Sequence, residues 1–259
     1  MKTFKFVLCF VAVTILSSCI DSEEKIVLNA DNSGIYSMTL DMGKVLEMAA
    51  GFGAKNEGDK PKEKKDTTVY LKDFMSDADS LTAEEKALYS QGVLSFKIDE
   101  ENNEMKIMAS CPFKDAAGLT AVKNNLFKIV QKLKAFETAT GEKPKTGDEE
   151  DLKMGMKSTN PVEDYFKFFA APGKISNTVI NIDTLKNKIA SDSSLTMMNQ
   201  MAGMMGEVKY RTIIVLPKNV KKYEGPGSKV SADKRTITFE STLTDLMEHP
   251  EKISYIVEY

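Results

Sequence analysis

The sequence predicts an α+β fold, in which an antiparallel or mixed sheet is built from hairpins and helices pack on it. Strand-like alternation on either side of a turn signal occurs at residues 24–40 and again at residues 93–110. In both places, apolar residues at helical spacing follow the hairpin, and a further helix and strands complete the chain. Hairpins interleaved with helices are typical of α+β domains whose helices cover a sheet.

The composition limits the class of protein. With 259 residues, 42% of them hydrophobic, the chain is long enough for one large domain or two small ones. Its 35 basic and 38 acidic residues include no basic cluster, which argues against nucleic acid as a partner. No apolar run after residue 19 approaches the ~20 residues of a transmembrane helix.

The first 18 residues have the three parts of a secretory signal peptide. Lys2 and Lys5 supply the charged part, residues 6–16 are apolar, and Ser17 and Ser18 are the small residues at the end. The apolar run is too short to span a bilayer as a stable helix. We therefore predict that residues 1–18 are removed, with cleavage between Ser18 and Cys19.

Leu16-Ser17-Ser18-Cys19 resembles the lipobox of bacterial lipoproteins, which places a leucine and two small residues before a cysteine. The resemblance implies that the Cys19 thiol carries a covalent diacylglycerol and that its new amine takes an N-acyl lipid. Each buried methylene contributes about 0.8 kcal/mol, so two or three acyl chains give firm membrane anchoring. No other cofactor is expected.

Residues 19–24 are predicted to form a lipidated acidic tether, with Asp21, Glu23 and Glu24 as its charges. Such a cluster resembles the surface-export signal of lipoproteins in the Bacteroidetes group. A solvated spacer is the alternative interpretation. Ile20, at the second mature position, departs from the inner-membrane retention signal of enteric bacteria. These features favour the outer membrane, with outward display as a hypothesis.

Residues 25–138 are predicted to form a first α+β half. After the hairpin at residues 24–40, apolar spacing predicts a helix over 42–50, and residues 53–66 are expected to be an exposed loop. Thr82 and Glu85 fit a capping box that begins a short helix. The second hairpin, at 93–99 and 105–110, precedes a long amphipathic helix that spans residues 119–136.

Residues 139–160 are expected to be a linker or mobile loop, and residues 161–259 a second α+β half that packs on the first as one domain. In this half the pattern predicts a short helix over 161–170 and a longer one over 183–206. Strands are predicted at 207–216, 235–240 and 253–258, with a turn at 225–227.

The sequence contains one methionine cluster that could bind a metal. Met197, Met201, Met204 and Met205 share one face of the predicted helix, and thioethers select Cu(I) or Ag(I). The same spacing defines a core-facing stripe, which is the favoured interpretation. An adaptable partner-binding surface is a third.

Other chemistry has little support in the sequence, and no catalytic residue is assigned. His249 is the only histidine and lies in a turn-like stretch, while Cys111, the one cysteine after residue 19, ends a predicted strand. Asp77 and Asp79 begin like a calcium loop, but Leu81 stands where a ligand is needed.

Together these observations predict a non-enzymatic lipoprotein anchored in the membrane by its lipid, which binds an envelope protein or a glycan or supports an envelope complex. Residues 1–24 carry the resemblance to uncharacterised outer-membrane lipoproteins of the Bacteroidetes group. The alternatives are Cu(I) or Ag(I) handling through the methionine cluster and a carboxylate-based, glycan-active hydrolase. A lipid-carrying module would need an apolar cavity between sheet and helix.

Overall fold

The computed structural model describes residues 21–44, 46–47, 62–140, 165–193, 195–196, 199–200, 202 and 206–259. Its strands are β1 (Asp21–Leu28), β2 (Gly34–Asp41), β3 (Lys64–Tyr70), β4 (Val93–Asp99), β5 (Glu104–Phe113), β6 (Phe166–Ala171), β7 (Lys174–Val179), β8 (Lys209–Val215), β9 (Lys222–Glu224), β10 (Lys229–Val230), β11 (Thr236–Thr242) and β12 (Tyr255–Glu258). Its helices are η1 (Leu71–Phe74), α2 (Ala83–Tyr89), α3 (Ala116–Lys132), α4 (Ala135–Thr140), α6 (Ile182–Ser191), α8 (Leu243–Glu248) and η3 (Pro250–Ile253).

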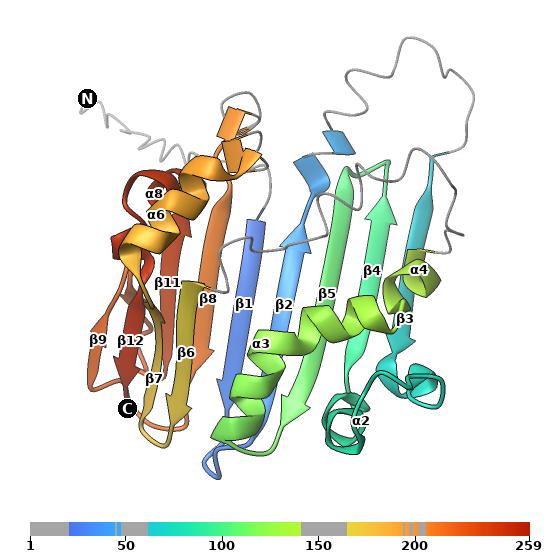
Figure 1. Cartoon of the computed structure of the whole chain (residues 1–259), viewed down its shortest axis with the longest axis horizontal. Coiled ribbons are helices and arrows are strands. Elements are labelled where there is room, and N and C mark those ends of the chain that lie inside the picture. The colour runs from blue at the N-terminus through green and yellow to red at the C-terminus, as the bar shows by residue number, and fades with distance from the viewer. Residues whose placement is uncertain are drawn as a thin grey trace, which may run out of the picture.

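Eight strands form one large sheet in the order β10-β11-β8-β1-β2-β5-β4-β3 (Figure 1). The first strand of the chain lies near its centre. β1 pairs antiparallel with β2 and parallel with β8, so that Asp21 is opposite both Asp41 and Lys209. The sheet is therefore mixed, and its strands come from both the 25–138 and the 161–259 regions of the chain.

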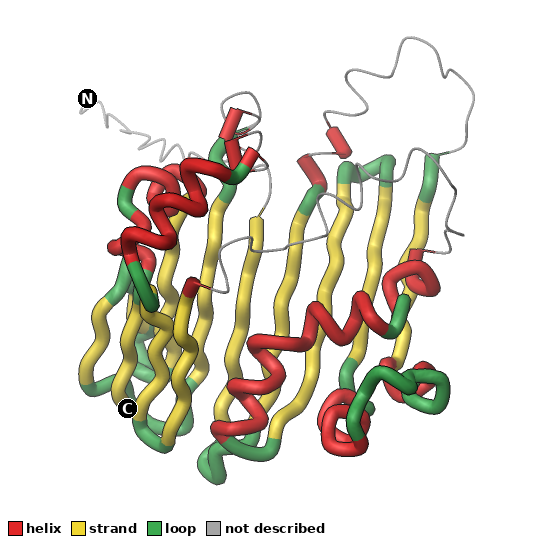
Figure 2. The backbone as a smooth tube through the Cα atoms, viewed as in Figure 1, coloured by secondary structure: helices red, strands yellow, loops and turns green. Residues whose placement is uncertain are grey.

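A second, antiparallel sheet has the order β6-β7-β12-β9. It lies in front of the β1, β8 and β11 side of the large sheet, while α3 runs diagonally across β2, β5 and β4 on the same side (Figure 2). β6 and α3 are neighbours, so the small sheet and the helix together cover this face. We call it the inner face and the opposite one the outer face.

The main core lies between the inner face and these two covering layers. Ile26 on β1, Tyr36 on β2 and Leu94 on β4 are almost fully buried there. α3 contributes an apolar stripe, namely Leu119, Val122, Leu126, Ile129 and Val130. Since burial of one such side chain contributes about 1.5–3 kcal/mol, this stripe holds the helix on the sheet.

A smaller apolar cluster lies beneath α6 and α8. It consists of Leu185, Ile189, Leu195, Val208, Leu243 and Leu246. Side-chain caps fix the start of both helices, because Asn181 accepts a hydrogen bond from the Thr184 amide and Thr242 accepts one from the Asp245 amide. This cluster packs at the end of the sheet where β1 begins (Figure 1).

The structure confirms the predicted α+β class and several individual elements. β4 has the predicted bounds, Val93–Asp99. α2 begins with the predicted capping box, in which the Thr82 hydroxyl accepts from the Glu85 amide and the Glu85 carboxylate accepts from the Thr82 amide. Strands were also correctly expected at β1, β2, β5, β8, β11 and β12, each within a few residues of its bounds.

Four predicted segments are wrong in part or in full. Residues 161–170 were expected to be helical, but Phe166–Ala171 is strand β6, which forms a hairpin with β7. The long helix predicted over 119–136 is two helices, because Lys134 takes the left-handed conformation with φ 52°. The helix predicted over 183–206 is interrupted after Ser191 by extended Asp192, and the described residues 193, 195–196, 199–200 and 202 beyond it are helical again. The expected loop over 53–66 includes the first residues of β3.

Candidate functional site

The site residues predicted from the sequence fall into two groups, those outside the described residues and those within the large sheet. Ser18 and Cys19 lie outside the described residues, as do the four methionines considered as an alternative metal site, Met197, Met201, Met204 and Met205. The predicted tether residues are not a spacer. Asp21, Glu23 and Glu24 belong to β1, the central strand, and pair with β2 and β8.

Alternation along β1 sends these acidic side chains to opposite faces of the sheet. Glu24 shares the inner face with Ile26 and Leu28, whereas Asp21 and Glu23 are on the outer face. Each glutamate has a cationic partner, Lys123 for Glu24 and Arg211 for Glu23. The fold therefore gives the two glutamates structural roles that are independent of any export signal.

Glu24 belongs to a polar cluster enclosed between the two sheets and α3. Lys123 on α3 donates to Glu24 Oε1 at 2.7 Å, and the Tyr36 hydroxyl donates to the same oxygen at 3.0 Å. The Lys123 side chain is only 5% exposed, and its ammonium lies 5.4 Å from the centre of the Phe168 ring on β6. Through this cation–π contact, the polar cluster also connects to the small sheet.

Tyr255 on β12 completes this buried polar cluster. Its ring stacks on Phe239 of the large sheet with centroids 4.8 Å apart. Complete burial, and to a smaller degree the charge of Glu24, raises the pKa of the Tyr255 phenol well above its usual value. Among the described residues, its hydroxyl has no hydrogen-bond partner. The cluster thus joins groups from β1, β2, β6, β12 and α3 in an enclosed setting.

Such a cluster is suited to positioning rather than to turnover. A buried ion pair costs desolvation energy and is retained where it specifies one arrangement of the packed elements. Here it fixes the orientation of α3 and of the small sheet relative to β1. One signal for it was present in the sequence, because Lys123 interrupts the apolar stripe four residues after Leu119 and three before Leu126.

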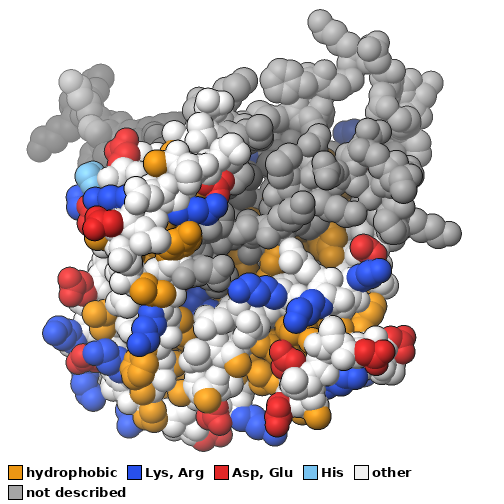
Figure 3. Space-filling view, viewed as in Figure 1, with side chains coloured by type: hydrophobic (Ala, Val, Ile, Leu, Met, Phe, Trp, Pro, Cys, Tyr) orange, Lys and Arg blue, Asp and Glu red, His pale blue; other side chains and the backbone are white. Residues whose placement is uncertain are grey.

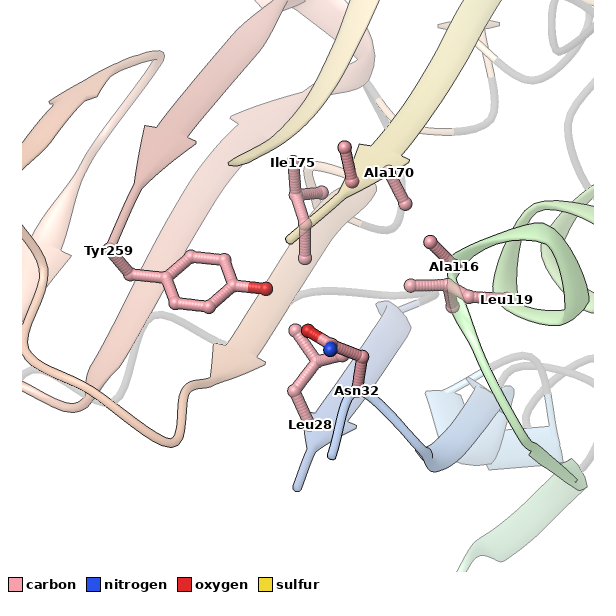
Figure 4. Close-up of a pocket in the computed structure, with 8 residues that line it drawn as sticks. Leu28, Asn32, Ala116, Leu119, Ala170, Ile175 and Tyr259 are labelled. Carbon is pink, nitrogen blue, oxygen red and sulfur yellow. The ribbon is translucent and has the colours of Figure 1, made fainter. Parts of the chain in front are cut away.

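A small apolar pocket opens at the far end of the same seam (Figure 4). It lies between the β1–β2 turn, the start of α3 and the small sheet, and is lined by Leu28, Asn32, Ala116, Leu119, Ala170, Ala171, Ile175 and Tyr259. The Tyr259 hydroxyl and the Asn32 amide point into it. Its lining contains no Asp, Glu, His, Lys or Cys, so that the Tyr259 hydroxyl is the one lining side-chain group that acid–base chemistry could use.

The outer face has an apolar row at the end of the sheet where β1 finishes. The register places Val215, Val27, Ile35 and Pro112 side by side across β8, β1, β2 and β5. The Ile35 side chain is 50% exposed, so solvent reaches this row. Tyr70 on β3 and Met108 on β5 are also exposed on this face.

The other end of the outer face carries charges of both signs. Arg211 bridges three strands there, with Glu23 Oε2 at 3.2 Å and Glu240 Oε1 at 3.1 Å, and Lys229 contacts Glu240 at 2.7 Å. On the inner side of the molecule, the described surface also mixes Lys or Arg with Asp or Glu (Figure 3). Neither surface has the single-sign basic patch of a nucleic-acid interface.

The remaining candidate residues have structural positions. Cys111 is buried beneath α2, and burial raises the pKa of its thiol to about 12, opposite to the shift that a nucleophile needs. His249 ends α8, and its Nδ1 lies 3.5 Å from Glu251. Asp77 and Asp79 are exposed, and within the described ranges no three His, Cys, Asp or Glu residues form a metal-binding group.

Within the described portion of the chain, no helix has the length and apolar character needed to cross a bilayer. Comparisons of this chain with protein-family models, with curated proteins and with solved structures give no match.

Proposed function

We propose that this protein is a lipid-anchored lipoprotein of the bacterial outer membrane, with a binding or scaffolding role rather than an enzymatic one. The observation that supports the anchor is the Leu16-Ser17-Ser18-Cys19 motif at the end of a short apolar run. A folded domain begins only two residues after the cysteine, at Asp21. The covalent diacylglycerol and N-acyl chains on Cys19 are its membrane anchor.

The binding role is supported by how the polar groups are used. Buried Lys123 and its partner Glu24 belong to an enclosed cluster that positions α3 and the small sheet. The outer face, by contrast, presents an extended surface with an apolar row beside Ser and Thr side chains. Contiguous exposed apolar residues with a polar rim are typical of protein interaction sites. An envelope protein is the partner that fits this surface best.

The anchor is tested by metabolic labelling of the full chain with a fatty-acid analogue. Cys19→Ala should lose the label and leave the membrane fraction. Cys111→Ala is the matched control and should retain both, because its thiol is buried in the folded domain. Equal labelling of the Cys19→Ala variant would contradict the anchor.

The binding role is tested with a photo-crosslinking residue in place of Ile35, which is exposed on the outer face. The same residue in place of Ala30, in the β1–β2 turn, serves as the control. We expect a discrete crosslink to an envelope protein from position 35 only. Equal crosslinking from both positions would mean that the crosslinked protein is merely nearby, and would contradict specific binding to the outer face.

A further inference from the structure

Building on the proposed lipid anchor, we infer that the end of the large sheet where β1 begins rests on the lipid surface, with the β1–β2 turn directed away from it. The inference starts from the length of chain between the lipid and the fold. Ile20 alone separates Cys19 from Asp21, the first residue of β1. Each residue spans at most about 3.6 Å, so the Cys19 Cα lies within about 7 Å of the Asp21 Cα.

Most flexible tethers allow a domain to tumble far from its membrane, but this one cannot. β1 is paired on both sides, with β2 and β8, from Asp21 to Val27. The backbone at Asp21 is therefore held by two ladders, and Ile20 alone separates it from the lipid-bearing Cys19. Since the acyl chains start at Cys19, the lipid headgroups come within contact distance of this end of the sheet.

The register identifies which other groups share that end. Asp41 at the end of β2 and Lys209 at the start of β8 are opposite Asp21. The β4–β5 turn at residues 100–103 lies at the same end, because Lys106 pairs with Asp41 and Asp99 with Glu104 (Figure 1). These groups, together with α6, α8 and the apolar cluster beneath them, form the membrane-proximal end (Figure 1).

The opposite end is correspondingly distal. The eight residues of β1 span about 23 Å at ~3.3 Å per residue step, and the β1–β2 turn follows them. The start of α3 at Ala116 and the pocket beside Leu28 and Tyr259 are at this distal end. The apolar row of the outer face, which includes Val27 and Ile35, is also nearer this end. The anchor thus holds these surfaces away from the bilayer.

Two labelling sites distinguish the ends. Glu101 is exposed in the proximal β4–β5 turn, and Ala30 is exposed in the distal β1–β2 turn. Glu101→Cys and Ala30→Cys are made in the full chain, purified from membranes in the lipidated form and labelled with a thiol-reactive fluorophore. The unsubstituted protein measures background labelling of buried Cys111. The proteins are then reconstituted into phosphatidylcholine vesicles that contain a lipid with a nitroxide quencher on its headgroup.

We expect the fluorophore at position 101 to lose its emission in these vesicles and the one at position 30 to keep it. Insertion of about 20 Gly and Ser residues between Ile20 and Asp21, with a root-mean-square span of about 25 Å, should abolish the difference. Equal quenching at both positions without the insertion would overturn the orientation while leaving the anchor intact. Failure of the purified protein to bind vesicles at all would overturn the anchor and the orientation together.

Discussion

Lys123 on α3 and Glu24 on β1 are 99 residues apart in the chain, yet their side chains meet at 2.7 Å between the two sheets. The pair connects the central strand to the helix that covers it, and Phe168 brings in the small sheet through the Lys123 ammonium. A charge pair at this position makes the packing of three layers depend on two side chains.

Removal of one partner should be costly. Lys123→Met leaves the Glu24 carboxylate without its ammonium and should lower the free energy of unfolding by about 3 kcal/mol. Adding Glu24→Gln should recover much of this loss, because the amide oxygen still accepts from Tyr36 and no buried charge remains. Urea denaturation of the protein lacking residues 1–20 measures both. A double variant less stable than Lys123→Met would contradict this account.

Two glycines should respond to alanine in opposite directions. A Cβ on Gly34 would lie 1.9 Å from the Val27 carbonyl oxygen and 2.6 Å from Phe113 Cζ, so Gly34→Ala should cost at least about 1–3 kcal/mol. Gly118, within α3, has its nearest neighbour at 3.4 Å. Gly118→Ala should stabilise by roughly 0.5 kcal/mol through helix propensity. Thermal melts compare the melting temperatures of the two variants. A lowered melting temperature for Gly118→Ala would show that Phe113 cannot move to accommodate the added methyl group.

The Cys111 thiol should be inert in the folded protein. It is fully buried, and burial raises its pKa to about 12, so little thiolate forms at neutral pH. In protein lacking residues 1–20, iodoacetamide should modify Cys111 only after unfolding in urea. Equally rapid modification of the folded protein would mean that β5 opens locally beneath α2.

Asp99 should make stability depend on pH in acid. A hydrogen bond from Lys64, followed by one from Asn102, lowers its pKa from 3.8 to about 2. A carboxyl group with a lowered native pKa stabilises the fold above its unfolded value, and this contribution is lost as the pH falls through the native one. The loss should occur between about pH 4 and pH 2. Asp99→Asn should reduce the change in the free energy of unfolding, measured with urea, across that pH window. An unchanged pH dependence would mean that other carboxyl groups cause it.

A role of Glu23 in the proposed export signal can be separated from its structural role in the sheet. Glu23→Gln and Arg211→Gln both break the partly exposed Glu23–Arg211 ion pair, and Arg211→Gln also removes the contact with Glu240; each should cost no more than about 1 kcal/mol. Because Glu23 is part of the sheet, we expect both variants to show wild-type accessibility in protease shaving of intact cells. Loss of surface exposure by Glu23→Gln alone would instead identify Glu23 as part of an export signal.

Local sequence signals predicted the elements that local forces determine. The capping box at Thr82 and the alternation at Val93–Asp99 depend on residues near in sequence, and both are confirmed. The segment over 161–170, which carries Phe166, Phe168 and Phe169, was predicted to be helical, but it forms a strand because Phe168 packs inward into the main core while Phe169 is exposed. That choice depends on tertiary burial, which outweighs local propensity.

Long-range relationships escaped the sequence. The parallel pairing of β1 with β8 has no local signature, and the short acidic run at residues 21–24 looked like a solvated segment. The sheet tolerates the charges of Glu24 and Glu23 because Lys123 and Arg211, from distant segments of the chain, form ion pairs with them. The proposed lipid site at Cys19, by contrast, depends entirely on a contiguous motif, which the sequence displays directly.

The pairing of β1 with β8 also has a consequence for how the protein is made. A chain is synthesised from its N-terminus, so β1 exists long before its partner, since Glu23 and Arg211 are 188 residues apart. Until β8 emerges, β1 has a ladder only with β2, and its other edge is open to pairing with foreign strands. High contact order slows folding to milliseconds or longer. We therefore expect the nascent chain to depend on holdase chaperones, and its aggregation during overexpression to begin at the β1 edge.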